Sequence, residues 1–373
     1  MKIFRHILFI AIAMSVAVAC DRGIDPISKV EPGPDEEAPK VTIDYPTEGT
    51  AIRVKEDTTN VGIKFVATDD IEIESIVIEL NGTDIATMEE FKDYRRVVET
   101  YNYDNLTNGE HTLTITVTDM TGKSASSSVN FEKIEPYRTQ YDGEIFYMPF
   151  DASFIELVSI TTASEEGSPE FATGRMKQAY KPIANSYVTM PTANFAPGDS
   201  LTESAFSATF WYNPSAADAT RAGILVIGPP DEDHPEYPDA QNDRSNGFRL
   251  FREGNETNQT IKLNVGNGTS DSWFDGGATA SVDPTAIDWV HVAFTISSDY
   301  VVVYLDGQIV KEGAFEGPVG WEGCDILSIG SGAPRFTGWS HFSDVGSLYD
   351  ELRIFNKALS QQEVQTIMDE TGK

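Results

Sequence analysis

The fold class is decided by the stretch YVVVYLDGQIVK, residues 300–311. Its Asp-Gly pair favours the left-handed backbone of a two-residue hairpin turn, and strand-forming residues flank it on both sides. Because side chains alternate along a strand, Val301, Val303 and Leu305 fall on one face, and Val302 and Tyr304 fall on the other. The stretch therefore predicts an antiparallel β-hairpin with two distinct faces.

Further short strands and one helix surround this hairpin. The predicted strands are 205–211, 223–227, 247–251, 261–265, 289–296, 325–329 and 348–355. Ser360-Gln361-Gln362-Glu363 has the form of a capping box, beside which Leu359 and Val364 can form a hydrophobic staple. Val364, Ile367 and Met368 then form a short apolar stripe that must dock on the sheets. Residues 141–373 are thus predicted to form a large β-sandwich closed by a short C-terminal helix.

A smaller strand-rich segment precedes this domain at residues 41–133. Asn81-Gly82 reads as a tight hairpin turn, and residues 111–117 alternate strictly between apolar and polar side chains. About seven strands with turn signals every 8–12 positions predict an immunoglobulin-like sandwich. The strand-poor piece 88–101 is predicted to be a helical turn or a long loop, and residues 134–140 link the two domains.

The N-terminus resembles an export signal. Lys2, Arg5 and His6 precede the apolar run 7–19, which is too short to span about 30 Å of hydrocarbon comfortably. Ala17-Val18-Ala19-Cys20 resembles a bacterial lipobox, which implies removal of residues 1–19 and lipidation of Cys20, for example with palmitate. An ordinary cleaved signal with a chance cysteine is the alternative. Residues 20–40 are acidic and Pro-rich, and they predict a stiff, extended tether.

Charge and cysteine content restrict the function. The 373 residues include 59 Asp and Glu against 27 Lys and Arg, giving a net charge of −32, which disfavours nucleic acids and anionic lipid surfaces. With only two cysteines, the chain has no internal disulfide framework, and Cys324 is expected to be a buried side chain. Neutral or cationic ligands remain.

Several motifs of the second domain occur together in a known order and spacing. They are Phe146–Asp151, Phe206–Trp211, Trp289–Thr295, Val303–Gly307, Leu327–Gly330 and Tyr349–Ser360. Together they resemble the LamG-like jelly rolls of the concanavalin A-like lectin/glucanase superfamily. The first domain resembles bacterial Ig-like spacer domains.

The whole arrangement resembles the surface glycan-binding lipoproteins of Bacteroidetes polysaccharide-utilisation systems. This resemblance implies an all-β protein that is lipid-anchored in the outer membrane, faces the cell exterior and captures polysaccharide for a neighbouring import complex. Fold analogy alone does not establish such a function.

Loop aromatics are the candidate glycan contacts, because the apolar C–H faces of sugars stack on aromatic planes and their hydroxyls need polar partners. Trp211 and Trp289 alternate within strands and are expected in the core. The candidates lie instead in loop-like stretches: Trp273, Trp339 and Trp321, with Asn267 and Asp271 near Trp273, and Tyr237, Asp239 and Arg244 in the polar insert 229–246. The alternatives are that each Trp tucks under its own loop and that the insert is merely solvated.

Calcium is implied by the resemblance. Asp151 and Asp350 match the family's ligand carboxylates, and Asp344 is nearby in sequence. Asp151 is followed by ASFIE, whereas the family typically has a Gly/Asn/Asp-rich run. No His/Cys cluster suits zinc.

Catalysis is not expected. No strand carries the Glu-x-Asp-x-x-Glu pattern of the superfamily's glucanases, and no Gly-x-Ser-x-Gly elbow is present. The preferred hypothesis is a non-catalytic glycan-binding protein. The alternatives are a structural or protein-interaction component of the surface complex without sugar binding and, third, a glycoside hydrolase.

Overall fold

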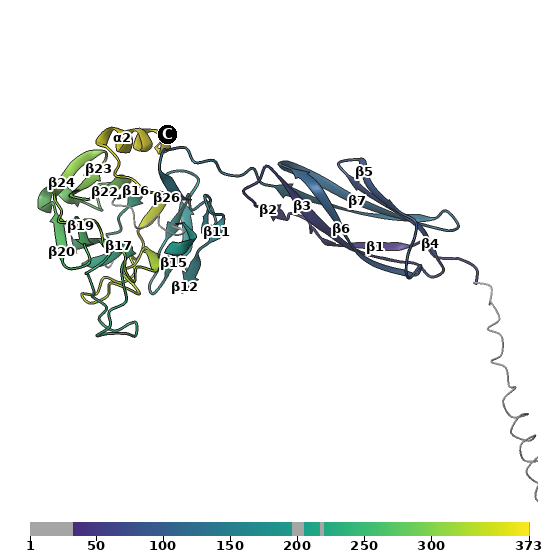
Figure 1. The fold of residues 1–373 in the computed structure, drawn as a ribbon, viewed down its shortest axis with the longest axis horizontal. Coiled ribbons are helices and arrows are strands. Elements are labelled where there is room, and N and C mark those ends of the chain that lie inside the picture. Colours follow the sequence, from purple (N-terminus) through teal and green to yellow (C-terminus); the bar gives the residue numbers. More distant parts are fainter. Residues whose placement is uncertain (1–32, 196–204, 217–219, 373) are drawn as a thin grey trace, which may run out of the picture. The chain divides into compact units, whose positions relative to one another are not determined.

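The computed structural model describes residues 33–195, 205–216 and 220–372. The described residues divide into two compact units, the first comprising residues 33–52 and Thr58–Ile134, and the second comprising Arg53–Asp57 and the described residues from Glu135 onward. Both units are built from antiparallel strands, apart from one parallel pair in the first (Figure 1). The predicted all-β class is confirmed.

The first unit is a sandwich of two sheets. One sheet has the order β1 (Lys40–Tyr45), β3 (Thr58–Thr68), β6 (Arg96–Thr107), and the other has the order β2 (Ala51–Ile52), β8 (Ser124–Lys133), β7 (Gly109–Asp119), β4 (Ile73–Leu80), β5 (Thr83–Met88). Ile63, Phe65 and Ile115 are among the side chains buried between them. The Asn81-Gly82 turn joins β4 to β5, and both residues have positive φ angles.

One prediction for this unit is wrong in part. Residues 88–101 were expected to be a helical turn or loop, but β6 begins at Arg96 and pairs with β3 from Arg96 through Thr107. Val97 is buried while Val98 is exposed, so buried and exposed positions alternate there. Few positions of β6 are buried, and this hides the pattern in the sequence. The long ladder to β3 supplies the stability that local sequence preference does not.

The second unit is a larger sandwich of two eight-stranded sheets. The first, here called the β20 sheet, has the order β12 (Ser164–Glu166), β15 (Tyr187–Pro191), β25 (Ile326–Ile329), β17 (Arg221–Ile227), β18 (Phe248–Asn255), β19 (Asn258–Gly266), β20 (Asp271–Asp275), with β21 (Ser281–Val282) also on β19. The second, the β26 sheet, has the order β13 (Glu170–Thr173), β14 (Gln178–Lys181), β26 (Leu348–Phe355), β16 (Phe206–Asn213), β22 (Val290–Ile296), β23 (Tyr300–Leu305), β24 (Gln308–Ala314), with β9 (Glu144–Met148) also on β26. Short elements complete the unit: β10 (Ile155–Glu156), β11 (Thr161–Thr162), and the 3₁₀ turns η1 (Thr192–Asn194) and η2 (Gly277–Ala280).

The elements predicted at the C-terminal end are confirmed. Strands β23 and β24 form the hairpin, and Asp306 and Gly307 have positive φ angles at its turn. Helix α2 (Gln361–Thr371) begins with the predicted capping box between Ser360 and Glu363. Val364 and Ile367 of the helix pack on the outer face of the β26 sheet, in a cluster with Phe355 and Tyr304.

Two long segments meet on the outer face of the β20 sheet. Phe336, from the segment 330–347, packs with Val226 and Phe251, which point away from the sandwich core. The amides of Thr337 and Gly338 both donate to the carbonyl of Gln241, in the insert 229–246, at 2.9 Å. A Cβ on Gly338 would lie 2.8 Å from that of Asn242, so this close approach requires glycine. The two segments therefore form one joined surface.

Candidate functional site

Two exposed tryptophans lie side by side on this surface. Trp273 comes from β20, where its neighbour Phe274 points into the core and alternation turns Trp273 outward. Trp339 comes from the segment 330–347. Each is 41% exposed, and their ring centroids are 5.9 Å apart with 31° between the ring planes.

Arg244 joins the two rings. Its guanidinium carbon lies over both, at 5.5 Å from the Trp273 ring centroid and 5.2 Å from that of Trp339. Arg244 Nε is 3.3 Å from Oδ2 of Asp271, and the same oxygen accepts a hydrogen bond of 2.7 Å from Asn264. We call Trp273, Trp339, Arg244 and Asp271 the aromatic platform.

A buried layer supports the platform from below. His341 is fully buried, stacks on Phe336 with ring centroids 4.6 Å apart, and contacts Phe251 edge to face. Its Nε2 is 3.2 Å from Oε1 of Glu253. Burial lowers the pKa of His341 to about 4, so its ring is neutral near pH 7.

A second buried residue fixes the backbone beside Arg244. Arg249 is fully buried, and its Nη2 donates to the carbonyl of Asp243 at 2.6 Å. Burial lowers the pKa of Arg249 to about 10, which still leaves it charged at neutral pH. The guanidinium thus holds the end of the insert against the sheet, and this orients Arg244.

Four of the eight candidate glycan contacts therefore come together in the platform. Sequence reasoning missed Asn264 and Arg249. Each is a polar residue at an outward position of an otherwise apolar strand, and this pattern could have singled them out. It also missed His341 and Arg221, whose Nη1 donates to the carbonyl of Trp339 at 3.4 Å. Nothing in the sequence marks the pairing of the two segments that brings these residues together.

The other four candidates lie outside the platform. Trp321 is partly buried and packs against the core, with its ring centroid 5.5 Å from that of Phe206. Asn267 organises its own turn by accepting from the amides of Thr269 and Ser270. Tyr237 is 42% exposed, and Asp239 is exposed and accepts from Thr337 through its carbonyl.

Asp344, a predicted calcium ligand, is committed to internal partners. It is fully buried, pairs with the guanidinium of Arg252, and accepts hydrogen bonds from the hydroxyls of Tyr212, Tyr349 and Ser347. Both carboxylate oxygens of Asp344 therefore already accept hydrogen bonds from donors within the protein.

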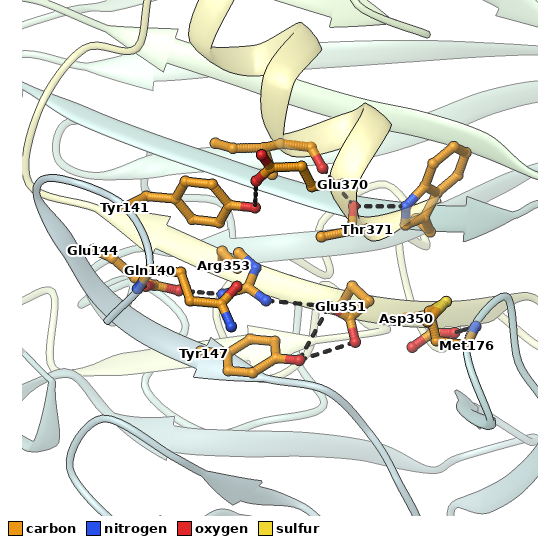
Figure 2. A network of polar contacts seen from close by, with 12 residues as sticks. Gln140, Tyr141, Glu144, Tyr147, Met176, Asp350, Glu351, Arg353, Glu370 and Thr371 are labelled. Atoms are coloured by element: carbon orange, nitrogen blue, oxygen red, sulfur yellow. Dashed lines mark hydrogen bonds and ion pairs between the residues drawn. The ribbon is translucent and has the colours of Figure 1, made fainter. Parts of the chain in front are cut away.

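Asp151 and Asp350, the other two predicted calcium ligands, are close enough for the charge of Asp151 to add to the effect of burial, which raises the pKa of Asp350. Asp151 pairs with Lys177 at 2.7 Å. Oδ2 of Asp350 accepts a hydrogen bond of 2.8 Å from the backbone amide of Met176 (Figure 2). Oδ1 of Asp350 is buried and has no hydrogen-bond partner among the described residues, and burial raises the pKa of this carboxyl to about 7.

These residues do not form a ready calcium site. Lys177 already supplies a positive charge to Asp151, and within residues 33–195, 205–216 and 220–372 no three His, Cys, Asp or Glu side chains are grouped to hold a metal. Calcium binding stays a prediction, which thermal unfolding in calcium and in chelator would test.

A second arginine cluster lies on the β26 sheet. Arg353 is 2% exposed, pairs with Glu144 and with Glu351, and stacks over the ring of Tyr147 at 3.6 Å (Figure 2). The Tyr147 hydroxyl donates to Glu351, and the Gln140 amide donates to Glu144. The cluster anchors the segment before β9 to the sandwich.

The predicted lipid anchor belongs to the N-terminal region of the sequence. Cys20, the predicted lipidation site, lies outside the described residues. In the part of the chain that the structure describes, no helix has the length and apolar character needed to span a bilayer.

Cys324 is buried as expected, and burial raises the pKa of its thiol to about 12.

Comparison with known proteins finds a family match within each unit. Residues 184–365 match the family described as the concanavalin A-like lectin/glucanases superfamily, and residues 39–115 match a bacterial Ig domain. The predicted Ig-like sandwich followed by a concanavalin A-like sandwich is thereby confirmed. No curated protein sequence matches the chain.

Solved structures show distant likeness. Domain 4 of AbnA, a GH43 extracellular arabinanase from Geobacillus stearothermophilus, in complex with arabinotriose, is 19% identical over 60% of this chain and 97% of that domain, with a TM-score of 0.43. The receptor binding domain of botulinum neurotoxin C/D mosaic serotype is 14% identical, with a TM-score of 0.42, and the match covers 61% of this chain and about half, 51%, of that one. At these scores the matches carry no functional argument.

Proposed function

We propose that this protein binds a polysaccharide without cleaving it, through the aromatic platform. The observation that carries the proposal is the meeting of Trp273 and Trp339, from separate segments, with Arg244 over both rings. Two large aromatic side chains that remain 41% exposed at one place are unusual unless a partner covers them.

The chemistry of the platform suits a sugar. The indole faces offer apolar planes for the C–H faces of sugar rings, while Arg244 and Asp271 offer hydroxyl groups a donor and an acceptor. Trp and Arg are also the residues that most often dominate binding energy at interfaces. One compact site thus combines both kinds of contact that a glycan needs.

The placement of the acids supports a non-catalytic role. A glycoside hydrolase needs two carboxyl groups on either side of the bond, roughly 5–9.5 Å apart. Among the described residues, the acids with raised pKa values are Asp350 and Glu351, which are neighbours on β26 and are 0% and 9% exposed. A polymer has no access to a pair buried in this way.

The sequence supports a position at the cell surface. The export signal, Cys20 and the acidic tether 20–40 suit a lipoprotein anchored in the outer membrane and facing outward, with the Ig-like unit as a spacer. In this proposal the sugar-binding unit passes its polysaccharide to a neighbouring import complex.

Affinity gel electrophoresis tests the proposal. The soluble protein, beginning after Cys20, is run through native gels that contain plant, microbial or host polysaccharides. We expect at least one polymer to retard it without release of reducing ends, and we expect Trp273→Ala/Trp339→Ala to abolish the retardation. Tyr300→Ala is the matched control, because Tyr300 is also 41% exposed but lies on β23 of the other sheet.

A protein-contact role is the second candidate, favoured by one observation in the first unit. A pocket of about 460 Å³ there is lined by Glu48, Glu110 and Glu132 beside His111 and Phe131, and it suits a basic segment of a partner. If no polysaccharide retards the protein, and pull-downs from the outer membrane capture a partner that the triple substitution of these glutamates by Gln releases, this second function replaces the first.

A further inference from the structure

We propose that the aromatic platform takes a single soluble, uncharged glycan chain and rejects both flat crystalline polymers and polyanionic ones. This inference rests on the proposed function and narrows its ligand class. Two independent observations carry it: the shape of the platform and the pairing of its charges.

The shape excludes a flat surface. A crystalline polymer presents its sugar rings in one plane, so it touches two tryptophans together only where their rings are coplanar. Here the planes of Trp273 and Trp339 differ by 31°, and the Arg244 guanidinium lies over both rings. A single chain can turn between the two rings and pass beside Arg244, whereas a rigid plane cannot.

The charges favour an uncharged ligand. Arg244 and Arg221 both contact the platform tryptophans, but each is paired, Arg244 with Asp271 and Arg221 with Glu253, both at 3.3 Å. An anionic glycan would have to compete with these carboxylates and would approach a chain whose net charge is −32. Paired arginines still present N–H donors, which is what neutral hydroxyl groups need.

The test compares three classes of polymer on the unlipidated protein with both units present. Soluble neutral polymers (arabinan, mixed-linkage β-glucan, soluble starch) and polyanions (polygalacturonate, heparin) are used in affinity gels, and microcrystalline cellulose and chitin are used in pull-downs. We expect retardation by a neutral soluble polymer, no depletion by the crystalline polymers, and an affinity that changes less than about twofold between 50 and 500 mM NaCl, because exposed ion pairs are the salt-sensitive contacts.

A variant pair ties the result to the site. We expect Arg244→Ala to weaken binding to the soluble polymer about tenfold or more, as loss of an interface hot spot does. Arg175→Ala is the matched control, since Arg175 also lies over a tryptophan, Trp211, at 4.8 Å but beside helix α2, and it should leave affinity unchanged.

The outcomes separate the inference from the proposed function. Depletion onto cellulose or chitin that the Trp273→Ala/Trp339→Ala variant loses, or tighter and salt-sensitive binding to a polyanion, overturns the inference while glycan binding stands. Failure of every polymer to bind overturns the proposed function and the inference with it.

Discussion

The second unit contains two clusters in which an arginine meets aromatic rings and a carboxylate, one buried and one partly exposed. Arg353 and Arg244 each lie over aromatic rings and each pair with a carboxylate. Arg353 is 2% exposed and packs on the rings of Tyr141 and Tyr147, whereas the side chain of Arg244 is 25% exposed and borders two tryptophans that reach solvent.

The difference lies in what each cluster leaves open. The hydrogen-bond partners of Arg353 are Glu144 on β9, Glu351 on β26 and Tyr137 in the segment before β9, so the cluster holds that segment and the sheet together. At the platform, the exposed part of each indole and the exposed part of the Arg244 side chain remain open to a partner. Similar side chains therefore stabilise the fold in one place and, in the proposed function, bind a ligand in the other. The following predictions test this contrast.

The largest expected effect is on the buried cluster. Arg353→Met leaves the buried carboxylates of Glu144 and Glu351 without their cation, so we expect the free energy of unfolding to fall by about 3–5 kcal/mol. Urea denaturation of the second unit's transition measures this. An unfolding free energy within 1 kcal/mol of wild type would mean that this cluster contributes no more than a surface pair.

The second largest effect is expected at the platform, on glycan affinity more than on stability. Trp273→Ala is expected to reduce glycan affinity about thirtyfold or more, equivalent to about 2 kcal/mol, because the residue is a central exposed aromatic contact. The free energy of unfolding should change by less than this, since the ring already reaches solvent. Isothermal titration calorimetry and urea denaturation of the same sample give both numbers. A variant that loses stability but retains affinity would place Trp273 with the structural residues.

The third prediction concerns pH and the layer beneath the platform. Burial lowers the pKa of His341 to about 4 from an ordinary value near 6.5, so the unfolded chain binds more protons between these values. Stability should therefore fall as the pH drops from 6.5 towards 4, with His341 accounting for up to about 2 kcal/mol at pH 5.

His341→Gln isolates that contribution. Glutamine cannot titrate and can still reach Glu253, the partner of His341 at 3.2 Å. Urea denaturation at pH 7, 6 and 5 should show a shallower loss of stability for the variant than for wild type. Parallel losses would show that the carboxylates, and not His341, dominate the acid response.

The sequence predicted the framework of the molecule well, because its signals are local. The Asp306-Gly307 turn, the capping box at Ser360 and strict alternation in β7 each depend on residues close in sequence. The prediction for β6 failed because its signal is not local: that strand is stabilised by pairing with β3, which is distant in sequence.

The candidate site was only half predictable for a related reason. Residue type singled out Trp273, Trp339, Arg244 and Asp271 individually, but their meeting depends on the contact between Gln241 and Thr337 in two separate segments. Trp321 resembled Trp273 and Trp339 in sequence and yet packs against the core rings of Phe206 and Phe248. Contacts between loops leave no periodic pattern in a sequence.

The smallest expected effect compares the two ion pairs directly. Asp271→Asn removes a partly exposed carboxylate from Arg244, and since such pairs contribute about 0–1 kcal/mol, the free energy of unfolding should change by no more than that. Glu144→Gln, the equivalent change at the buried pair with Arg353, should cost several times as much. Because Asp271 neutralises Arg244, the Asn variant should also gain affinity for polygalacturonate relative to wild type. Equal stability losses at the two sites would show that solvent exposure does not distinguish the clusters, and unchanged polyanion binding would show that Asp271 does not control the charge of the platform.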